Sequence, residues 1–225
     1  MTENIFGKVK RGWDWVWNSD SLLSWVVAFI IIFVFVKFIF FPVLSLLFGT
    51  ALPLAGVESS SMDHQIVKDE RGFLSICGSY SGENNYLDFE GYWEHCGGWY
   101  EARNITQEQF YSFPLHNGFN KGDIVLVYGR FTPQQGDIII FTPNTNSLAP
   151  LPIVHRIVSI SDNEGVIVYQ TKGDHNPEQL TVSNNVLRTD ETKISPEQIV
   201  GKVIFRIPYL GWVKIWFSDL FNTVF

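Results

Sequence analysis

One uncharged stretch near the start of the chain constrains its fold more than any other feature. Residues 22–36 carry no charged side chain, and after Lys37 the apolar run continues through residues 38–48. A helix needs about 20 mostly apolar residues to cross a bilayer. The run begins too late and is too long for a cleavable signal peptide. Residues 21–48 are therefore predicted to form a retained membrane anchor, with a polar cap near Ser21 and a stop at Pro42.

The basic residues around this anchor indicate its orientation. Lys8, Lys10 and Arg11 precede it, whereas residues 38–67 contain no Lys or Arg. Basic residues flanking a span favour the cytoplasmic side. Residues 1–20 are therefore predicted to be a cytoplasmic lead, and the chain beyond the anchor is predicted to lie outside.

The chain beyond the anchor has the pattern of a β-rich domain. Short β-branched runs alternate with Gly, Pro, Asn and Asp clusters, and no run shows a sustained helical period. The runs are residues 124–127, 138–141, 153–160 and 166–169. Residues 49–207 are predicted to form a mainly β domain of coiled antiparallel sheet, with residues 64–120 as an insert of weak periodicity.

The last 18 residues, 208–225, show a helical pattern instead. Lys214, Ser218 and Asn222 recur every four residues among apolar neighbours. This pattern predicts a C-terminal amphipathic helix that lies on the membrane, with packing against the sheet as the alternative.

Composition and cysteine content narrow the classes of function. A formal net charge of −7 without a basic stripe argues against a nucleic-acid partner. Cys77 and Cys96 fall on the outer side, where oxidation favours a disulfide, although two free buried thiols remain the alternative. With His64, His95 and His116 they lack the paired spacing of zinc ligands, so neither metal nor cofactor is expected.

Three short segments far apart on the chain carry groups suited to peptide hydrolysis. They are Ser59-Ser60-Ser61-Met62, Val154-His155-Arg156 and Thr171-Lys172-Gly173-Asp174. A hydroxyl nucleophile, an imidazole base and a carboxylate are the groups of a serine peptidase. Each segment alone is weak evidence, since a triple serine is commonly a polar turn and a lone histidine a core residue.

Together with the Gly-Asp strand starts at Gly122 and Gly136, these segments resemble type I signal peptidases of the archaeal and endoplasmic-reticulum branch. That branch uses a Ser-His-Asp set in place of the bacterial Ser-Lys pair. The resemblance implies that Ser61 is the nucleophile, with Ser59 and the Ser61 amide forming the oxyanion hole. It also implies that Met62 packs toward the membrane surface and that His155 is the base.

The acid of this set departs from the family pattern. Asp174 in the Lys-Gly-Asp turn is the expected acid, but the second acid that usually follows six residues later is replaced by Leu180. Glu178 is the alternative acid. We favour Asp174.

The resemblance implies a membrane-bound serine endopeptidase that cleaves signal peptides from exported preproteins. It implies residence in the cell membrane or the membrane of the endoplasmic reticulum, in contact with the lipid bilayer. Its expected partners are preprotein signal peptides, with accessory subunits or the secretion translocon as further candidates. The alternative is a catalytically inactive, membrane-tethered β domain that binds protein partners.

Overall fold

The computed structural model describes residues 5–68, 72–80 and 86–211. It divides into two compact units, Met1–Leu47 and Phe48–Phe225. The predicted C-terminal amphipathic helix lies outside the described residues, apart from its first positions.

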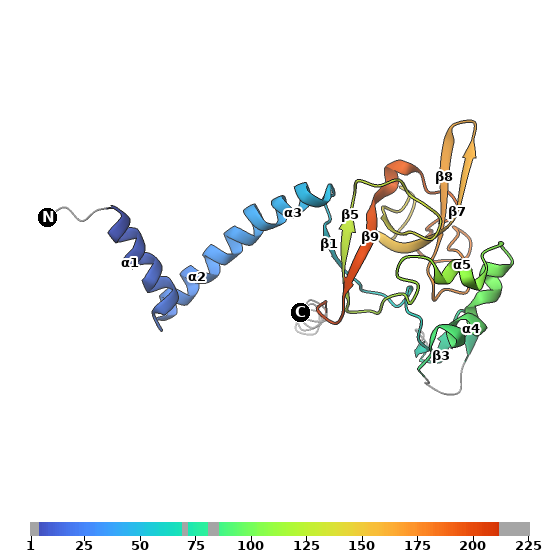
Figure 1. Cartoon of the computed structure of the whole chain (residues 1–225), viewed down its shortest axis with the longest axis horizontal. Helices are drawn as coiled ribbons and strands as arrows, with labels where there is room; N and C mark the ends of the chain where they lie inside the picture. Colours follow the sequence, from blue (N-terminus) through green and yellow to red (C-terminus); the bar gives the residue numbers. More distant parts are fainter. Residues whose placement is uncertain (1–4, 69–71, 81–85, 212–225) are drawn as a thin grey trace. The chain divides into compact units, whose positions relative to one another are not determined.

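The first unit is helical (Figure 1). Its helices are α1 (Ile5–Asn18), α2 (Leu22–Phe35), the π-helical segment η1 (Val36–Phe40) and the start of α3 (Phe41–Phe48). The last three form one 27-residue helix, Leu22–Phe48, that is long and apolar enough to cross a membrane. Ser21 caps this helix, because its side chain accepts a hydrogen bond from the Ser24 amide at 3.2 Å.

Pro42 does not end the helix as the sequence suggested. The helix continues to Phe48, and the π-helical turn lies just before the proline. In this turn the Phe41 amide bonds to the Val36 carbonyl. Proline lacks an amide hydrogen and its ring presses on the preceding turn. A locally widened turn removes that conflict, so the helix passes through Pro42.

The second unit is built on a six-stranded antiparallel sheet with strand order β1-β5-β9-β6-β7-β8. Its strands are β1 (Leu54–Gly56), β5 (Ile124–Tyr128), β6 (Ile138–Phe141), β7 (Ile153–Asn163), β8 (Val166–Lys172) and β9 (Ile199–Ile207), with the short 3-10 turn η2 (Pro196–Gln198) before the last. Register shifts interrupt the β5–β9, β6–β9 and β7–β8 pairings, and such bulges bend and coil a sheet. The predicted antiparallel β fold is thus confirmed.

The two Gly-Asp strand starts share one local structure. Gly122 and Gly136 have φ angles of 91° and 93°, which favour glycine. Each following aspartate accepts a hydrogen bond at 3.0 Å from an amide three residues earlier. The repeated dipeptide therefore encodes the turn that begins β5 and β6.

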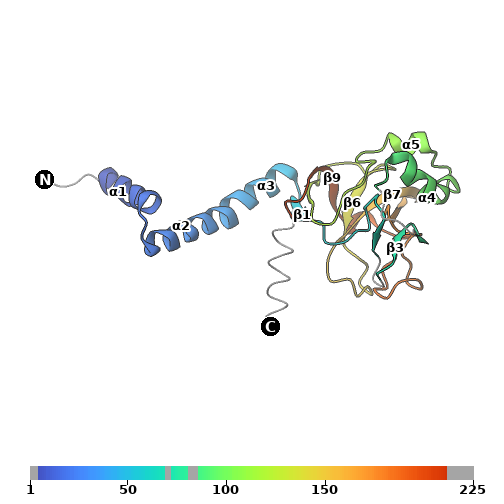
Figure 2. The same cartoon turned by 90° about the horizontal axis from the view of Figure 1, so that it is seen from below.

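The insert lies beside the main sheet (Figure 2), and its core also includes Val158 of β7. It contains a three-stranded sheet, β2-β3-β4, and two helices. The elements are β2 (Val67–Lys68), β3 (Leu74–Ile76), β4 (Ser79–Tyr80), α4 (Phe89–Glu101) and α5 (Gln107–Tyr111). Cys77 and Cys96 form a disulfide that joins the β3–β4 turn to α4.

The sequence showed no sustained helical period within residues 49–207, yet the structure has helix α4 there. Its buried face repeats at helical spacing through Tyr92, Trp93, Cys96 and Tyr100. Tyrosine, cysteine and the weak helix former Gly97 obscured this period in the sequence. Asp88 caps the helix by accepting from the Gly91 amide at 2.8 Å, a start signal that the sequence does contain.

Candidate active site

The serine box lies in a tight turn between β1 and the insert. The Ser59 and Ser61 hydroxyl oxygens are 3.1 Å apart, and the Asp63 amide donates to the Ser60 carbonyl at 3.0 Å. The Ser61 carbonyl accepts a hydrogen bond from the His175 amide at 2.9 Å. The half-buried Ser61 is thereby tied to the loop that follows β8.

Met62, which the resemblance implied would pack toward the membrane surface, is buried inside the domain. Its side chain is only 1% exposed and packs with Phe119 and Val125 in the core of the main sheet. Its carbonyl also accepts from the Phe119 amide at 3.0 Å. Burying the Met62 thioether stabilises the turn that carries the neighbouring Ser61.

The candidate base His155 lies on β7, opposite Ile139 of β6, and is buried. A Cβ built on Gly173 would lie 2.7 Å from the His155 Nε2 atom and 2.8 Å from the Ser61 carbonyl oxygen. The Ser61 carbonyl and the His155 ring therefore face the same small space beside Gly173. That Cβ position would also lie 2.7 Å from the Asn176 Nδ2 atom. Only glycine leaves this space open.

The other ring nitrogen of His155 contacts a carboxylate that sequence reasoning missed. His155 Nδ1 is hydrogen-bonded to Glu191 Oε1. The same oxygen accepts from the Thr171 hydroxyl at 2.9 Å, and Glu191 Oε2 accepts from the Leu180 amide at 2.7 Å. No local motif marks Glu191, which follows His155 by 36 residues. Its main chain, however, pairs with Thr171 at the end of β8.

Asp174, the expected acid, contacts a different partner. Its carboxylate accepts from Arg156 Nη2 at 2.7 Å and from Arg156 Nε at 3.0 and 3.2 Å. It also accepts from Tyr100 at 3.2 Å and contacts His64 Nε2 at 2.9 Å. The prediction that Asp174 holds the His155 ring is corrected by these contacts, because adjacent positions on β7 face opposite ways and Asp174 pairs with Arg156.

Arg156 and Asp174 form a fully buried ion pair. Burial alone would raise the pKa of Asp174, but the charge of Arg156 and hydrogen bonds from His64 and Arg156 hold it well below its usual range. Arg156 Nη1 donates to the carbonyls of Pro114 and Gly136, and Nη2 donates also to the Leu115 carbonyl. Arg156 therefore connects the C-terminal end of the insert to the sheet.

The insert adds further groups to the Asp174 network. The His64 ring stacks on Tyr92, with centroids 3.7 Å apart, and burial lowers the pKa of His64 against the opposing influence of Asp174. The Tyr92 hydroxyl donates to the Asp174 carbonyl at 3.0 Å. Lys172 Nζ donates to the carbonyls of Gly173 and Asp174, and burial lowers its pKa to about 8. These contacts fix the loop that carries Gly173.

Glu178, the alternative acid, lies on the surface. Its Oε1 atom accepts from Asn184 Nδ2 at 3.0 Å, and both residues are exposed. Neither of the two acids weighed from the sequence therefore contacts the His155 ring in the described part of the chain.

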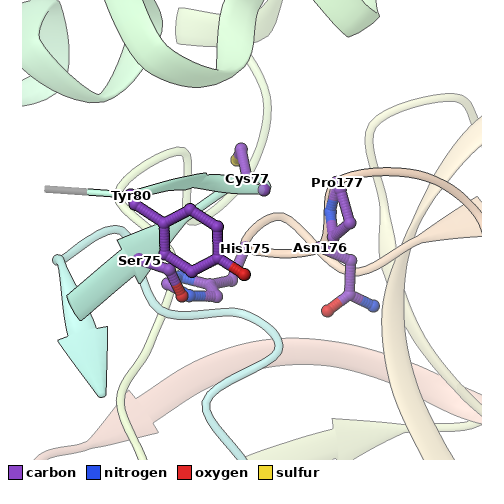
Figure 3. Close-up of a pocket in the computed structure, with 7 residues that line it drawn as sticks. Ser75, Cys77, Tyr80, His175, Asn176 and Pro177 are labelled. Carbon is purple, nitrogen blue, oxygen red and sulfur yellow. The ribbon is translucent and has the colours of Figure 1, made fainter. Parts of the chain in front are cut away.

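A pocket of about 240 Å³ lies between the β3–β4 hairpin and the loop that follows β8 (Figure 3). Ser75, Tyr80 and His175 lie on one side of it, and Asn176 and Pro177 on the other. His175 is the residue whose amide holds the Ser61 carbonyl. His175 therefore lines the pocket and also contacts the main chain of the candidate nucleophile Ser61.

Across the described ranges, no group of three or more His, Cys, Asp or Glu side chains is arranged to hold a metal ion. Cys77 and Cys96 are joined to each other, and His64 contacts Asp174. These are three of the residues considered from the sequence as metal ligands.

Ser61 and His155, the nucleophile and base expected from the sequence, thus lie on either side of Gly173 in this fold. Comparisons with known proteins are more specific. The chain is 30% identical over 111 residues to the signal peptidase complex catalytic subunit SEC11 of Lachancea thermotolerans. The matched region covers 47% of this chain and 61% of that protein. It is 31% identical over 110 residues to SEC11 of Saccharomyces cerevisiae strain YJM789.

These homologues confirm the resemblance to signal peptidases of the endoplasmic-reticulum type. The chain spans about three fifths of the length of the curated relatives it matches. No protein-family model matches the chain.

Proposed function

We propose that this chain is a membrane-bound serine endopeptidase that removes signal peptides from exported preproteins. One observation carries the proposal: the Ser61 turn and the His155 Nε2 atom meet at Gly173 in a homologue of signal peptidase catalytic subunits. The three segments come from distant parts of the chain, so the fold itself brings these groups together.

In this proposal Ser61 Oγ attacks the scissile carbonyl while His155 Nε2 takes the hydroxyl proton. His155 then protonates the leaving amine, and a water molecule hydrolyses the acyl-enzyme. The Ser61 amide and the Ser59 hydroxyl are assigned to the developing oxyanion. Support for the Ser59 role is the 3.1 Å separation of the two hydroxyl oxygens, which places Ser59 beside the attacking group.

The sheet offers a place for an extended substrate. β1 is an edge strand of the six-stranded sheet, and the serine turn follows it directly. An extended peptide can add to an exposed edge through main-chain hydrogen bonds. We assign the cleavage region of the signal peptide to the edge formed by β1, which would deliver its scissile bond to Ser61.

The helix Leu22–Phe48 supplies the membrane attachment in this proposal. The basic residues Lys8, Lys10 and Arg11 favour a cytoplasmic N-terminus and an outer peptidase domain. The relatives are named as catalytic subunits of a complex, so accessory subunits are the proposed partners. A secretion translocon that supplies preproteins is a further proposed partner.

The rival function, an inactive β domain that binds partners, is not favoured. The homologues are catalytic subunits, and Ser61 and His155 converge in this chain. A decayed site would not need Gly173 to stay open between them.

The test is cleavage of a preprotein by the full chain reconstituted in liposomes. Ser61→Ala and His155→Ala should abolish cleavage, since each removes a group that takes part in bond breaking. Ser60→Ala is the matched control, because it removes a hydroxyl from the same turn and should cut at the native rate. Equal cutting by the native chain and Ser61→Ala, or no cutting by either, overturns the proposal.

A further inference from the structure

We propose that Glu191 is the residue that positions His155 for catalysis, and that Asp174 is a structural ion-pair partner. This inference rests on the proposed peptidase function and names a residue that the sequence motifs do not mark.

The direction of the hydrogen bond between His155 and Glu191 sets the state of the ring. An ionised carboxylate only accepts, so His155 Nδ1 carries the proton in this contact. Nε2 then keeps its lone pair, and Nε2 is the atom that faces Gly173 and the Ser61 turn. Glu191 therefore selects the tautomer that can take a proton from Ser61.

Glu191 is held rigidly enough for this role. Its side chain is fully buried, and both oxygens are bound, one by the Thr171 hydroxyl and one by the Leu180 amide. Its amide donates to the Leu180 carbonyl at 2.8 Å, and its carbonyl accepts from the Thr171 amide at 2.9 Å. Main-chain and side-chain contacts thus attach the carboxylate to β8, the strand beside His155 on β7.

Asp174 is committed to other groups. Its two oxygens serve Arg156, His64 and Tyr100, and its pair with Arg156 is fully buried. Turning the Asp174 carboxylate toward His155 would leave the Arg156 guanidinium without its counter-ion inside the protein. Such a buried, unpaired charge is strongly unfavourable. The two acids therefore have separate tasks.

The charge of Glu191 also matters during the reaction. When His155 takes the Ser61 proton it becomes an imidazolium, and a buried carboxylate on its other nitrogen stabilises that cation. A neutral amide of the same shape supplies neither this charge nor a fixed acceptor. The expected loss in Glu191→Gln is therefore in turnover and not in substrate binding.

The first measurement is steady-state cleavage by the reconstituted full chain. Glu191→Gln should lower kcat on the order of 10,000-fold, as for the acid of a Ser-His-Asp triad, with KM changed by less than about threefold. Glu191→Asp keeps the charge and should recover about tenfold or more of that loss. Glu178→Gln, which changes an exposed carboxylate bound to Asn184, is the control and should keep the native kcat.

The second measurement does not need turnover. Nitrogen-15 spectra of histidine-labelled full chain, with His155 assigned by its loss in His155→Ala, report which ring nitrogen carries the proton. The native chain should show protonated Nδ1, and Glu191→Gln should shift His155 toward protonated Nε2. If the native chain does not cleave but this shift occurs, the peptidase function fails while the Glu191 contact stands.

Three results overturn the inference. The first is a Glu191→Gln variant that keeps kcat within about tenfold of the native chain. The second is an unchanged His155 tautomer in that variant. The third is an Asp174→Asn variant that retains native thermal stability but shows the kcat loss and tautomer shift expected for Glu191→Gln.

Discussion

Removing the charge of Asp174 should lower the stability of the fold. It should not remove a group that acts directly in catalysis. Both partners of the Arg156–Asp174 pair are fully buried, and Arg156 Nη2 lies 2.7 Å from the carboxylate. Breaking one side of a buried pair costs about 3–5 kcal/mol. In Asp174→Asn an amide oxygen remains, and Arg156 keeps its three carbonyl acceptors, so we expect about 3 kcal/mol.

This cost can be read as a change in melting temperature. For a unit of 150–250 residues each kcal/mol shifts Tm by about 2–4 °C, so Asp174→Asn should melt about 6–12 °C below the native chain. Near-ultraviolet circular dichroism of the detergent-solubilised chain follows the packing of the aromatic insert. Glu178→Gln is the control and should melt at the native temperature, because its carboxylate is exposed.

A double variant sharpens the prediction. Arg156→Met with Asp174→Asn removes both charges, so its stability loss should be smaller than the sum of the two single losses. Additive losses would show that the two side chains do not act as a pair. A native Tm in Asp174→Asn together with a collapse of kcat would refute the structural role assigned to Asp174.

The other predictions concern the space at the site, the insert and pH. Gly173→Ala should abolish cleavage, since its Cβ would lie 2.7 Å from His155 Nε2, and the cleavage assay with a melting control checks this; native kcat would contradict it. Replacing both Cys77 and Cys96 by serine should lower the free energy of unfolding by about 3 kcal/mol, measured as a lower Tm, and an unchanged Tm would contradict it. Because the folded state lowers the pKa of Asp174 below its ordinary 3.8, its stabilisation is complete above that value and is lost as pH falls below about 4. The Tm gap between the native chain and Asp174→Asn should therefore narrow below pH 4, and a gap that is constant down to pH 2 would contradict the linkage.

The sheet could be predicted from the sequence because its signals are local. The β-branched runs that became β5, β6, β7 and β8 are bounded by turn residues, and strand periodicity depends only on neighbours. Gly122 and Gly136 mark turns that only glycine adopts readily. Strand order and the edge position of β1 depend on long-range pairing, which no local pattern reports.

Ser61 and His155 could be proposed from the sequence because each lies in a short motif. Ser61 precedes Met62, and His155 precedes Arg156, so a few letters were enough. Asp174 was expected as the acid because the Lys-Gly-Asp turn is equally conspicuous, but in the structure its carboxylate contacts Arg156. Glu191 lies in no short motif. Its contact with His155 depends on the pairing of the 187–195 segment with β8, which no local pattern reports.

The structure changes the interpretation of Leu180, which stands where the family pattern has its second acid. An absent second acid would fit the alternative of a catalytically inactive β domain. The Leu180 amide, however, donates to the Glu191 carboxylate at 2.7 Å, and the two main chains pair through the Glu191 amide. A carboxylate is therefore present at that place on the site, supplied from a later segment of the chain.

A buried carboxylate is costly unless its partners are kept. Glu191 is fully buried with His155, Thr171 and Leu180 around it, and each donates to the carboxylate. A chain that had lost catalysis would gain by replacing this group with an apolar side chain, because a well-packed apolar substitute is neutral or stabilising. The buried contact between Glu191 and His155 therefore supports the proposed peptidase over an inactive binding domain.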